Sequence, residues 1–320
     1  MRSKIGCIII LNYYLLEGFL LMETKMAIDK KALNKLRFFL AGVFALTFVG
    51  IVLRSLSLLF FFDSYIGYFA VGALLPILTN IFFLVAAVLI LVLTLLLPKD
   101  APYISGQETP ISIKVASALC AVASLVIAPV HFITWIGNSS FLWTCLIPLL
   151  LLVSAGYFAL NIINQKAEFK PFGALLLVLL FVFYLAMSYF DVFVQMNSPN
   201  KIMMHMSCLA LMLFFMSEAR CVAGAMKKKL YIFSTSVAIF FVGVEAIPSI
   251  IAIISSKMTT PEYLSYDILL CPILLYLITR AALMMRIPAE EAAPEEVLVE
   301  DSEDEITDNT EESTDLQEGI

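Results

Sequence analysis

The sequence predicts an all-α fold, a polytopic membrane helix bundle of about eight transmembrane helices. Three observations predict it. Of the 320 residues, 61% are hydrophobic and 14% are charged, whereas a soluble domain is about half apolar and about a quarter charged. The apolar residues gather in blocks of about twenty or more, the length at which a helix spans a bilayer. Basic residues cluster in alternate connections, as expected of a chain that crosses a membrane repeatedly.

The bundle is predicted over residues 37–286. Because the hydrocarbon core of a membrane offers the backbone no hydrogen-bond partners, each apolar block must satisfy its own N–H and C=O groups as a helix. The expected spans are 37–60, 68–97, 113–136, 141–164, 172–196, 202–226, 230–255 and 265–285.

An N-terminal segment, residues 1–36, precedes the bundle. Its first 22 residues are apolar, with Arg2 and Lys4 near the start and further bases after them. The two sets of bases favour opposite orientations for this stretch. We interpret residues 1–22 either as a signal-like segment or as an extension upstream of a translation start at Met22 or Met26. They are left out of the predicted bundle.

The distribution of bases predicts the orientation. One set of connections is rich in them, whereas the other set holds only Lys201 and Lys257. Positively charged connections stay in the cytoplasm, so both ends of the bundle are expected there, with the protein in a bacterial plasma membrane. The rich side carries Lys25, Lys30, Lys31, Lys35, Arg37, Lys99, Lys114, Lys166, Lys170, Lys227, Lys228, Lys229 and Arg286.

Residues 287–320 form an acidic tail. They include fourteen Asp or Glu and no Lys or Arg, a composition that cannot bury enough apolar surface to fold by itself. We expect a disordered cytosolic segment. It either keeps the chain soluble and self-repelling or docks a basic cytosolic partner.

Several classes of site are not expected. The six cysteines all lie in apolar runs without paired spacing, which indicates small buried side chains and no disulfide or zinc framework. No phosphate-binding glycine loop and no hydrolase or metalloprotease motif is present in the sequence. We therefore predict no cofactor, no metal, no catalytic residue and no nucleic-acid partner. The lipid bilayer is the main partner that we expect.

An inner polar layer is predicted near the cytoplasmic ends of the spans, with Glu218, Arg220, Arg280 and Asn161 as members. Residues i and i+2 of a helix point to nearly opposite sides, so Glu218 and Arg220 need different partners. Depth along the spans favours a Glu218–Arg280 pair. For Arg220, pairing or a bound anion is favoured over snorkelling, because helical side chains lean toward the N-terminus of their helix. The alternative to a functional role is that the residues of this inner layer only hold neighbouring helices together.

An outer layer is predicted from Arg54, His131, Asp191 and Glu245. The first, second and fourth lie about 24–26 Å from the basic edges of their spans, at 1.5 Å per residue, with Asp191 somewhat further out. Ionisable groups inside a membrane are rare and usually face the bundle interior or a wet cavity. We therefore interpret these four residues as a substrate or ion site.

Glu245 is the strongest candidate for a functional residue in the outer layer. Pro248 removes the hydrogen bond that the carbonyl of Val244 would accept, and a freed carbonyl beside a carboxylate suits a cation or a proton relay. The alternative is an Arg54–Asp191 ion pair, with Glu245 protonated or hydrogen-bonded. A metal site that also uses His205 is chemically conceivable but not required by the spacing.

Two further patterns concern the architecture. Prolines in matching spans, Pro129 with Pro248 and Pro148 with Pro272, are compatible with a parallel duplication of four spans. Small residues recur at every fourth position of span 113–136, which predicts close helix contact and a central place for that span: Ala116, Cys120, Ser124 and Ala128.

The runs MNSPNK (Met196–Lys201) and SEAR (Ser217–Arg220) resemble uncharacterised multi-pass membrane proteins of Gram-positive bacteria. The resemblance covers two spans only. It implies a bacterial plasma membrane and no particular activity.

Three function classes follow, in this order. The first is a proton- or cation-coupled carrier of a small solute, with Glu245 and Asp191 as coupling or substrate groups and the inner layer as a gate. The second is a non-enzymatic sensor or scaffold that binds a partner through its acidic tail. The third is an intramembrane enzyme, which would need His131, Asp191 and Glu245 to converge.

Overall fold

The computed structural model describes residues 2–63, 66–98, 110–136, 141–163, 169–190, 198–225, 227–255 and 264–285. Side chains are described within 31–63 and within the later ranges, except at 141, 142 and 264. Asp191 and the acidic tail 287–320 therefore lie outside the described residues.

The described chain contains eight helices that are long and apolar enough to cross a membrane, which confirms the predicted helical membrane bundle. Their bounds follow the expected spans closely, because long apolar blocks have no other way to satisfy their backbone in lipid. The helices are α1 (Arg2–Phe61), α2 (Leu74–Leu96), α3 (Ile111–Trp135), α4 (Phe141–Ile163), α5 (Lys170–Phe190), α6 (Pro199–Val222), α7 (Lys228–Ile254) and α8 (Leu264–Met284).

The first helix differs from its expected span. It begins at Arg2, so the helical backbone continues through the N-terminal segment, and its membrane-length part is Lys31–Phe61. The bundle was predicted to start at residue 37.

The start of the second helix also differs. A span was expected from residue 68, but a small hairpin lies there, formed by β1 (Phe62–Asp63) and β2 (Tyr68–Phe69). The strands are antiparallel and pair Phe62 with Phe69, whose rings meet edge to face at 5.8 Å. Gly67 and Gly72 have φ of 76° and 78°, a left-handed conformation that glycine adopts freely and that interrupts a helix.

Local sequence sets both ends of α6. Ser198 caps the helix by accepting a hydrogen bond from the backbone N–H of Lys201 at 3.3 Å, and Pro199 follows in the first turn. Gly224 has φ of 75° just after the helix, and the N–H of Ala225 returns to the carbonyl of Arg220 at 2.9 Å. This is the usual glycine-assisted helix end.

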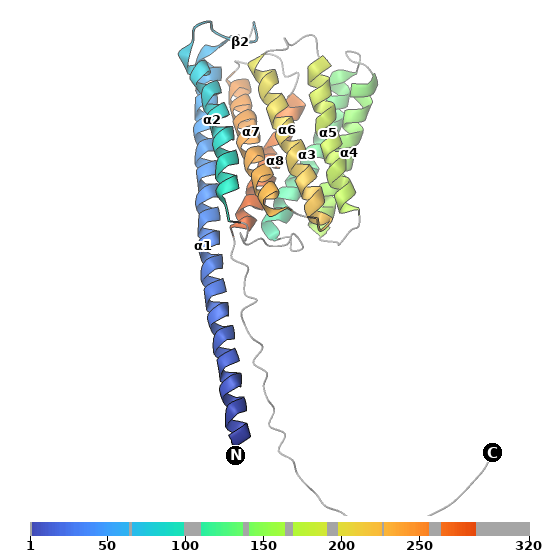
Figure 1. Cartoon of the computed structure of the whole chain (residues 1–320). Helices are drawn as coiled ribbons and strands as arrows, with labels where there is room; N and C mark the ends of the chain where they lie inside the picture. Colours follow the sequence, from blue (N-terminus) through green and yellow to red (C-terminus); the bar gives the residue numbers. More distant parts are fainter. Residues whose placement is uncertain are drawn as a thin grey trace, which may run out of the picture. The chain divides into compact units, whose positions relative to one another are not determined.

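Helices α3 to α8 form a closed ring in which each packs against the next and α8 returns to α3. Helices α1 and α2 lie side by side outside this ring, against α7 (Figure 1). Helices α6 and α7 are the most enclosed and α2 is the least. The expectation that span 113–136 is central is therefore wrong. Its small residues serve contacts of α3 with α4 and α8.

The helix contacts do not repeat as a parallel duplication requires. If α1–α4 corresponded to α5–α8, the extensive packing of α1 on α7 would have a counterpart between α5 and α3. In the described part of the chain α5 instead packs on α4 and α6.

Glycines allow α1 and α7 to approach closely. A Cβ added at Gly243 would meet Thr47 Cγ2 at 2.7 Å, and one added at Gly50 would meet Val244 Cγ2 at 2.8 Å. Each glycine thus receives a side chain from the opposite helix. This reciprocal contact lies about one helical turn from Arg54 and Glu245.

Two basic side chains reach the ends of neighbouring helices. Arg37 Nε donates to the carbonyl of Met285 at 3.0 Å, just beyond α8, and Lys229 Nζ donates to the carbonyl of Leu95 at 2.9 Å in α2. Helix C-termini leave carbonyls without partners in their own helix. These two bases therefore also stabilise the fold, in addition to marking one side of the bundle.

Candidate functional site

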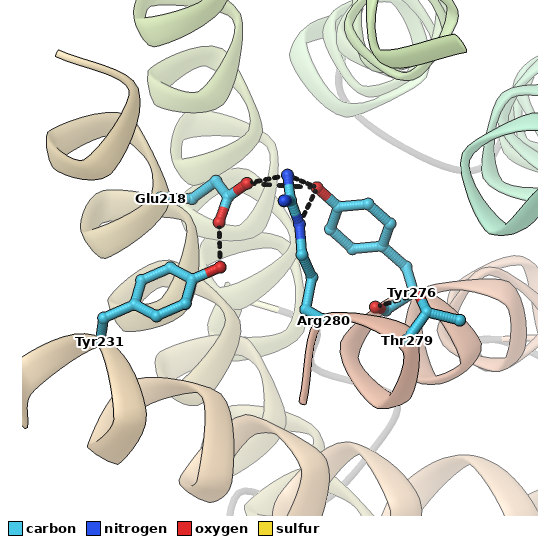
Figure 2. Close-up of polar contacts among 5 residues, drawn as sticks. All are labelled: Glu218, Tyr231, Tyr276, Thr279 and Arg280. Carbon is cyan, nitrogen blue, oxygen red and sulfur yellow. Dashed lines mark hydrogen bonds and ion pairs between the residues drawn. The ribbon is translucent and has the colours of Figure 1, made fainter. Parts of the chain in front are cut away.

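The tyrosine cluster, formed by Glu218, Tyr231, Tyr276 and Arg280, lies near the end of the bundle opposite the β1–β2 hairpin. Figure 2 shows the Arg280 guanidinium between the Glu218 carboxylate and the Tyr276 hydroxyl. Arg280 forms an ion pair with Glu218. Its Nε and Nη2 donate to the Tyr276 oxygen at 3.0 and 2.9 Å. The predicted Glu218–Arg280 pair across α6 and α8 is thus confirmed.

The tyrosines complete the bonding of the carboxylate. Tyr231 donates to Glu218 Oε2 at 2.6 Å, and Tyr276 donates to Oε1 at 3.3 Å. The Arg280 guanidinium also lies 5.2 Å from the centre of the Tyr276 ring, one turn earlier on α8. Glu218 is 1% and Arg280 6% exposed, so the cluster joins α6, α7 and α8 in a dry environment.

Asn161 belongs to the same level, as predicted, together with Tyr157 one turn before it on α4. The Tyr157 hydroxyl lies near Asn161 and Tyr276. Tyr157 Oη and Asn161 Nδ2 are both buried and interact with each other. Aromatic contacts hold Tyr157 in place, with Phe158 at 5.3 Å and Phe215 at 6.4 Å.

Arg220 corrects the predicted inner layer. It is exposed and stands in the last turn of α6, outside the tyrosine cluster. The cause is helical phase: Glu218 points inward, so a residue two positions later points away from the cluster. A guanidinium in the last turn is also favoured by the negative end of the helix dipole.

The Arg54 cluster, formed by Arg54, Asn200, Glu245 and Asp267, lies near the hairpin end of the bundle. Arg54 Nη2 donates to Glu245 Oε2 at 2.8 Å and to Asn200 Oδ1 at 3.2 Å. The two charged residues are 2% and 3% exposed, and Arg54 Nε is buried without a partner. The structure therefore brings Arg54 and Glu245 together. It does not describe Asp191, the alternative partner in the sequence interpretation.

Asp267 was missed by the sequence interpretation. It stands in the first turn of α8, is 6% exposed and lies close enough to Arg54 and Glu245 for their charges to interact. A signal was available, because Asp267 lies about 28 Å along α8 from Arg286, nearly the depth of the other predicted outer residues. Two carboxyl groups thus lie within electrostatic reach of the Arg54 guanidinium.

His131 is buried on α3 but has different partners from the Arg54 cluster. Its Nδ1 lies 3.2 Å from Ser265 Oγ, and its ring stacks on Trp135 at 5.8 Å and meets Tyr184 edge to face at 6.0 Å. The ring also lies close to the backbone of Trp143 on α4. The enzyme hypothesis needed His131 to converge with Glu245, and their separate bonding does not favour it.

The metal interpretation has no support in the described residues, which contain no group of three or more His, Cys, Asp or Glu placed to hold an ion. His205 instead bonds Ser188, with Nε2 3.1 Å from Oγ. The cysteines with described side chains are all free, as their sequence positions predicted: Cys120, Cys145, Cys208, Cys221 and Cys271.

Helix α6 contributes more polar groups than the sequence interpretation assigned to it. Lys201 was assigned to an exterior loop, but it lies in the first turn of α6, is 1% exposed and stands near His205. Further along α6, Ser207 Oγ lies 2.6 Å from the Tyr266 hydroxyl, and Cys208 Sγ donates to the same oxygen at 3.2 Å. These contacts tie α6 to α8 between the two clusters.

The two clusters lie far apart but share helices. Tyr231 and Glu245 are about 21 Å apart along α7 at 1.5 Å per residue. Each cluster pairs one guanidinium with a buried carboxylate on another helix, and α6, α7 and α8 contribute to both. Breaking such a pair by removing one partner is costly, because it leaves an uncompensated charge in a dry interior. Changes at either end can therefore bias how these three helices pack.

Comparisons with known proteins were made by family model, by sequence and by structure. The chain matches no family model, no curated protein and no solved structure. Any functional assignment therefore rests on the geometry of the two clusters.

Proposed function

We propose that this protein is a carrier that moves a small solute across a bacterial plasma membrane, coupled to protons or cations. The observation that carries the proposal is the Arg54 cluster, in which one buried guanidinium pairs with Glu245 and lies within electrostatic reach of a second carboxyl group, Asp267, on another helix. Intramembrane ionisable groups of this kind mark ion and proton pathways in membrane proteins.

The coupling step follows from the bonding of Arg54. Its Nη2 donates a hydrogen bond to Glu245 on α7, and Asp267 on α8 lies nearby. A proton or cation bound to Glu245 cancels the charge that holds Arg54 there, and Asp267 becomes the stronger partner. Because Arg54 belongs to α1, the exchange shifts the α1–α2 pair relative to the ring. The proposed carrier thus uses two packings that differ in ion pairing.

The tyrosine cluster is the proposed gate at the other end. Glu218 accepts from two tyrosines and Arg280, so α6, α7 and α8 are held together there. Opening this end would require these bonds to separate or to be exchanged for bonds to solute or water. Alternating access needs closure at one end while the other is open.

The orientation is part of the proposal. Bases gather at the end that holds the tyrosine cluster, so the positive-inside rule places that end and both ends of the bundle in the cytoplasm. The hairpin and the Arg54 cluster then face the exterior. The resemblance of two segments to multi-pass proteins of Gram-positive bacteria supports the same membrane.

Proteoliposomes test the proposal. Vesicles holding the full chain and a pH indicator are mixed with a panel of amino acids, sugars and dicarboxylates, and internal acidification and solute uptake are recorded. Wild type is expected to give saturable uptake with proton entry for one class of solute. Glu245→Gln should abolish the proton signal, and Arg220→Gln should retain it. Wild-type uptake and proton entry in the Glu245 variant would contradict the proposal.

The acidic tail favours a second candidate, a sensor or scaffold. Fourteen carboxylates without a base suit a basic cytosolic partner. A chain shortened after residue 286 should then lose a partner in affinity capture while any solute uptake persists. If the shortened chain captures the same proteins as the full chain, this second function has no support.

A further inference from the structure

Asp267 differs from Glu245 in its bonding within the Arg54 cluster. It is 6% exposed, and the described residues give its carboxyl group no ion pair and no side-chain hydrogen bond. The charges of Glu245 and Arg54 nevertheless act on it. Buried polar groups are nearly always bonded, and a buried charge without a direct partner is costly. The structure therefore disfavours a bare carboxylate at Asp267.

Helix packing places Asp267 level with Arg54. A Cβ added at Gly243 on α7 would meet Thr47 of α1 at 2.7 Å and Leu274 of α8 at 3.7 Å, so α1, α7 and α8 meet at this level. Helices α1 and α8 run in opposite directions. Arg54 and Asp267 each lie seven residues from this level toward the hairpin end, about 10 Å at 1.5 Å per residue. The electrostatic interaction of the two residues thus has a basis in the packing of the three helices.

The charges of the cluster balance only if it holds one proton. Arg54 contributes one positive charge, whereas Glu245 and Asp267 would contribute two negative charges if both were ionised. An uncompensated charge in a dry interior is costly, and two nearby carboxyl groups disfavour simultaneous ionisation. Glu245 accepts a hydrogen bond from Arg54 at 2.8 Å, which favours its ionised form. The balancing proton therefore belongs on Asp267.

The neighbouring titratable groups leave this balance unchanged. Thiols and phenols are uncharged at neutral pH. Lys201 acts on His205, and His131 bonds Ser265. The charges that act on the unbonded acid are those of its two cluster partners. The groups concerned are Lys201, His205 and Cys208 on α6, His131 on α3, and Tyr266 and Cys271 on α8.

A metal cation does not fit the cluster. Hard divalent cations take about six or more oxygen ligands, and the described residues contain no group of three or more His, Cys, Asp or Glu placed to hold an ion. The guanidinium of Arg54 already occupies the Glu245 oxygen that a cation would need. A proton, in contrast, needs one carboxyl oxygen and no cavity.

We propose that Asp267 carries one proton while Arg54 is paired with Glu245, and that this proton, not a metal cation, is the coupling ion. The second half rests on the proposed carrier function, whereas the first half does not. When Arg54 moves to Asp267, the O–H bond of Asp267 breaks and an O–H bond forms at Glu245. The cluster thus holds one proton and stays neutral in both packings.

Infrared difference spectroscopy of the purified full chain in detergent tests the protonation without a transport assay. A protonated carboxylic acid has a C=O stretching band that is separate from the bands of carboxylates and amides and that shifts in heavy water. At neutral pH, wild type should show this band, and Asp267→Asn should lose the part that a single acid contributes. Glu245→Gln should lose the same part, because Asp267 then ionises and pairs with Arg54.

Two controls accompany these spectra. Asp63→Asn removes an exposed acid at the β1–β2 hairpin, outside the cluster, and should leave the band unchanged. Sodium, lithium or potassium chloride added to wild type at constant pH should also leave it unchanged, since no metal cation displaces the proton.

Three spectroscopic results would overturn the proposal: an Asp267→Asn spectrum identical to that of wild type, a band that persists fully in Glu245→Gln, or a band that sodium or lithium removes at constant pH. Transport distinguishes the two halves. If the spectra are as expected but no solute enters proteoliposomes, the protonation of Asp267 stands and the carrier function fails. Solute uptake that a sodium gradient drives without proton entry would overturn the assignment of the coupling ion while leaving the carrier function in place.

Discussion

Removal of either partner of the Glu218–Arg280 pair should destabilise the bundle strongly. Both side chains are almost fully buried, and loss of one partner from a buried ion pair costs about 3–5 kcal/mol, because the other charge remains in a dry interior. We expect this loss for Arg280→Met and a similar one for Glu218→Leu. The tyrosines cannot compensate, since a hydroxyl carries no opposite charge.

The double variant separates the pair from its surroundings. With both charges replaced by apolar groups, the remaining cost is that of Tyr231 and Tyr276 hydroxyls that lose their carboxylate, about 1–3 kcal/mol for each. The double variant should therefore be less destabilised than the sum of the two single variants, with a coupling energy of about 4 kcal/mol.

The assay is reversible unfolding in mixed detergent micelles, followed by tryptophan fluorescence, for wild type, both single variants and the double variant. Arg220→Met is the control: it removes a charge from the same helix at an exposed position and should change the free energy of unfolding by less than about 0.5 kcal/mol. Additive effects of the two single variants would refute the view that Glu218 and Arg280 act as one unit.

Two further predictions concern packing and hydrogen bonding, measured in the same unfolding assay. Gly243→Ala places a Cβ 2.7 Å from Thr47 Cγ2 and should lower the free energy of unfolding by about 1–3 kcal/mol. The control is Gly42→Ala, which has open space around it and should be neutral or stabilising by up to about 1 kcal/mol. Equal effects of the two substitutions would contradict the close α1–α7 contact. Tyr266→Phe keeps the ring but removes the hydroxyl that lies 2.6 Å from Ser207 Oγ. The free energy of unfolding should fall by about 1–3 kcal/mol. An unchanged unfolding midpoint would show that this bond does not stabilise the α6–α8 contact.

The helices were predictable because their signal is local. Each apolar block is long enough to span a membrane, and lipid leaves the backbone no alternative to the helix. The Glu218–Arg280 pair was also predictable, because distance along a helix gives depth and only a few charges share that depth. Local glycine conformation at Gly67 and Gly72 explains where this reasoning misplaced the start of α2.

Errors arose where the result depends on how helices face one another. Arg220 was expected inside the inner polar layer. Because the side chain of Glu218 points into the bundle, the side chain of Arg220, two positions later on the same helix, points outward. Lys201 was assigned to a loop and Asp267 was missed, although both side chains are buried. Contacts such as α1 on α7 or α8 on α3 involve side chains far apart in sequence, and no local pattern specifies them.

The central claim is that Arg54 exchanges between Glu245 and Asp267 when a proton or cation binds. Asp267→Asn tests it most directly, because the variant keeps the Arg54–Glu245 pair and removes only the ability of the second partner to carry a charge. We measure solute-dependent proton entry into proteoliposomes, with the unfolding midpoint of the same preparation as a control for folding. The account predicts a folded protein with no coupled proton entry. A folded variant with wild-type solute uptake and proton entry would contradict it.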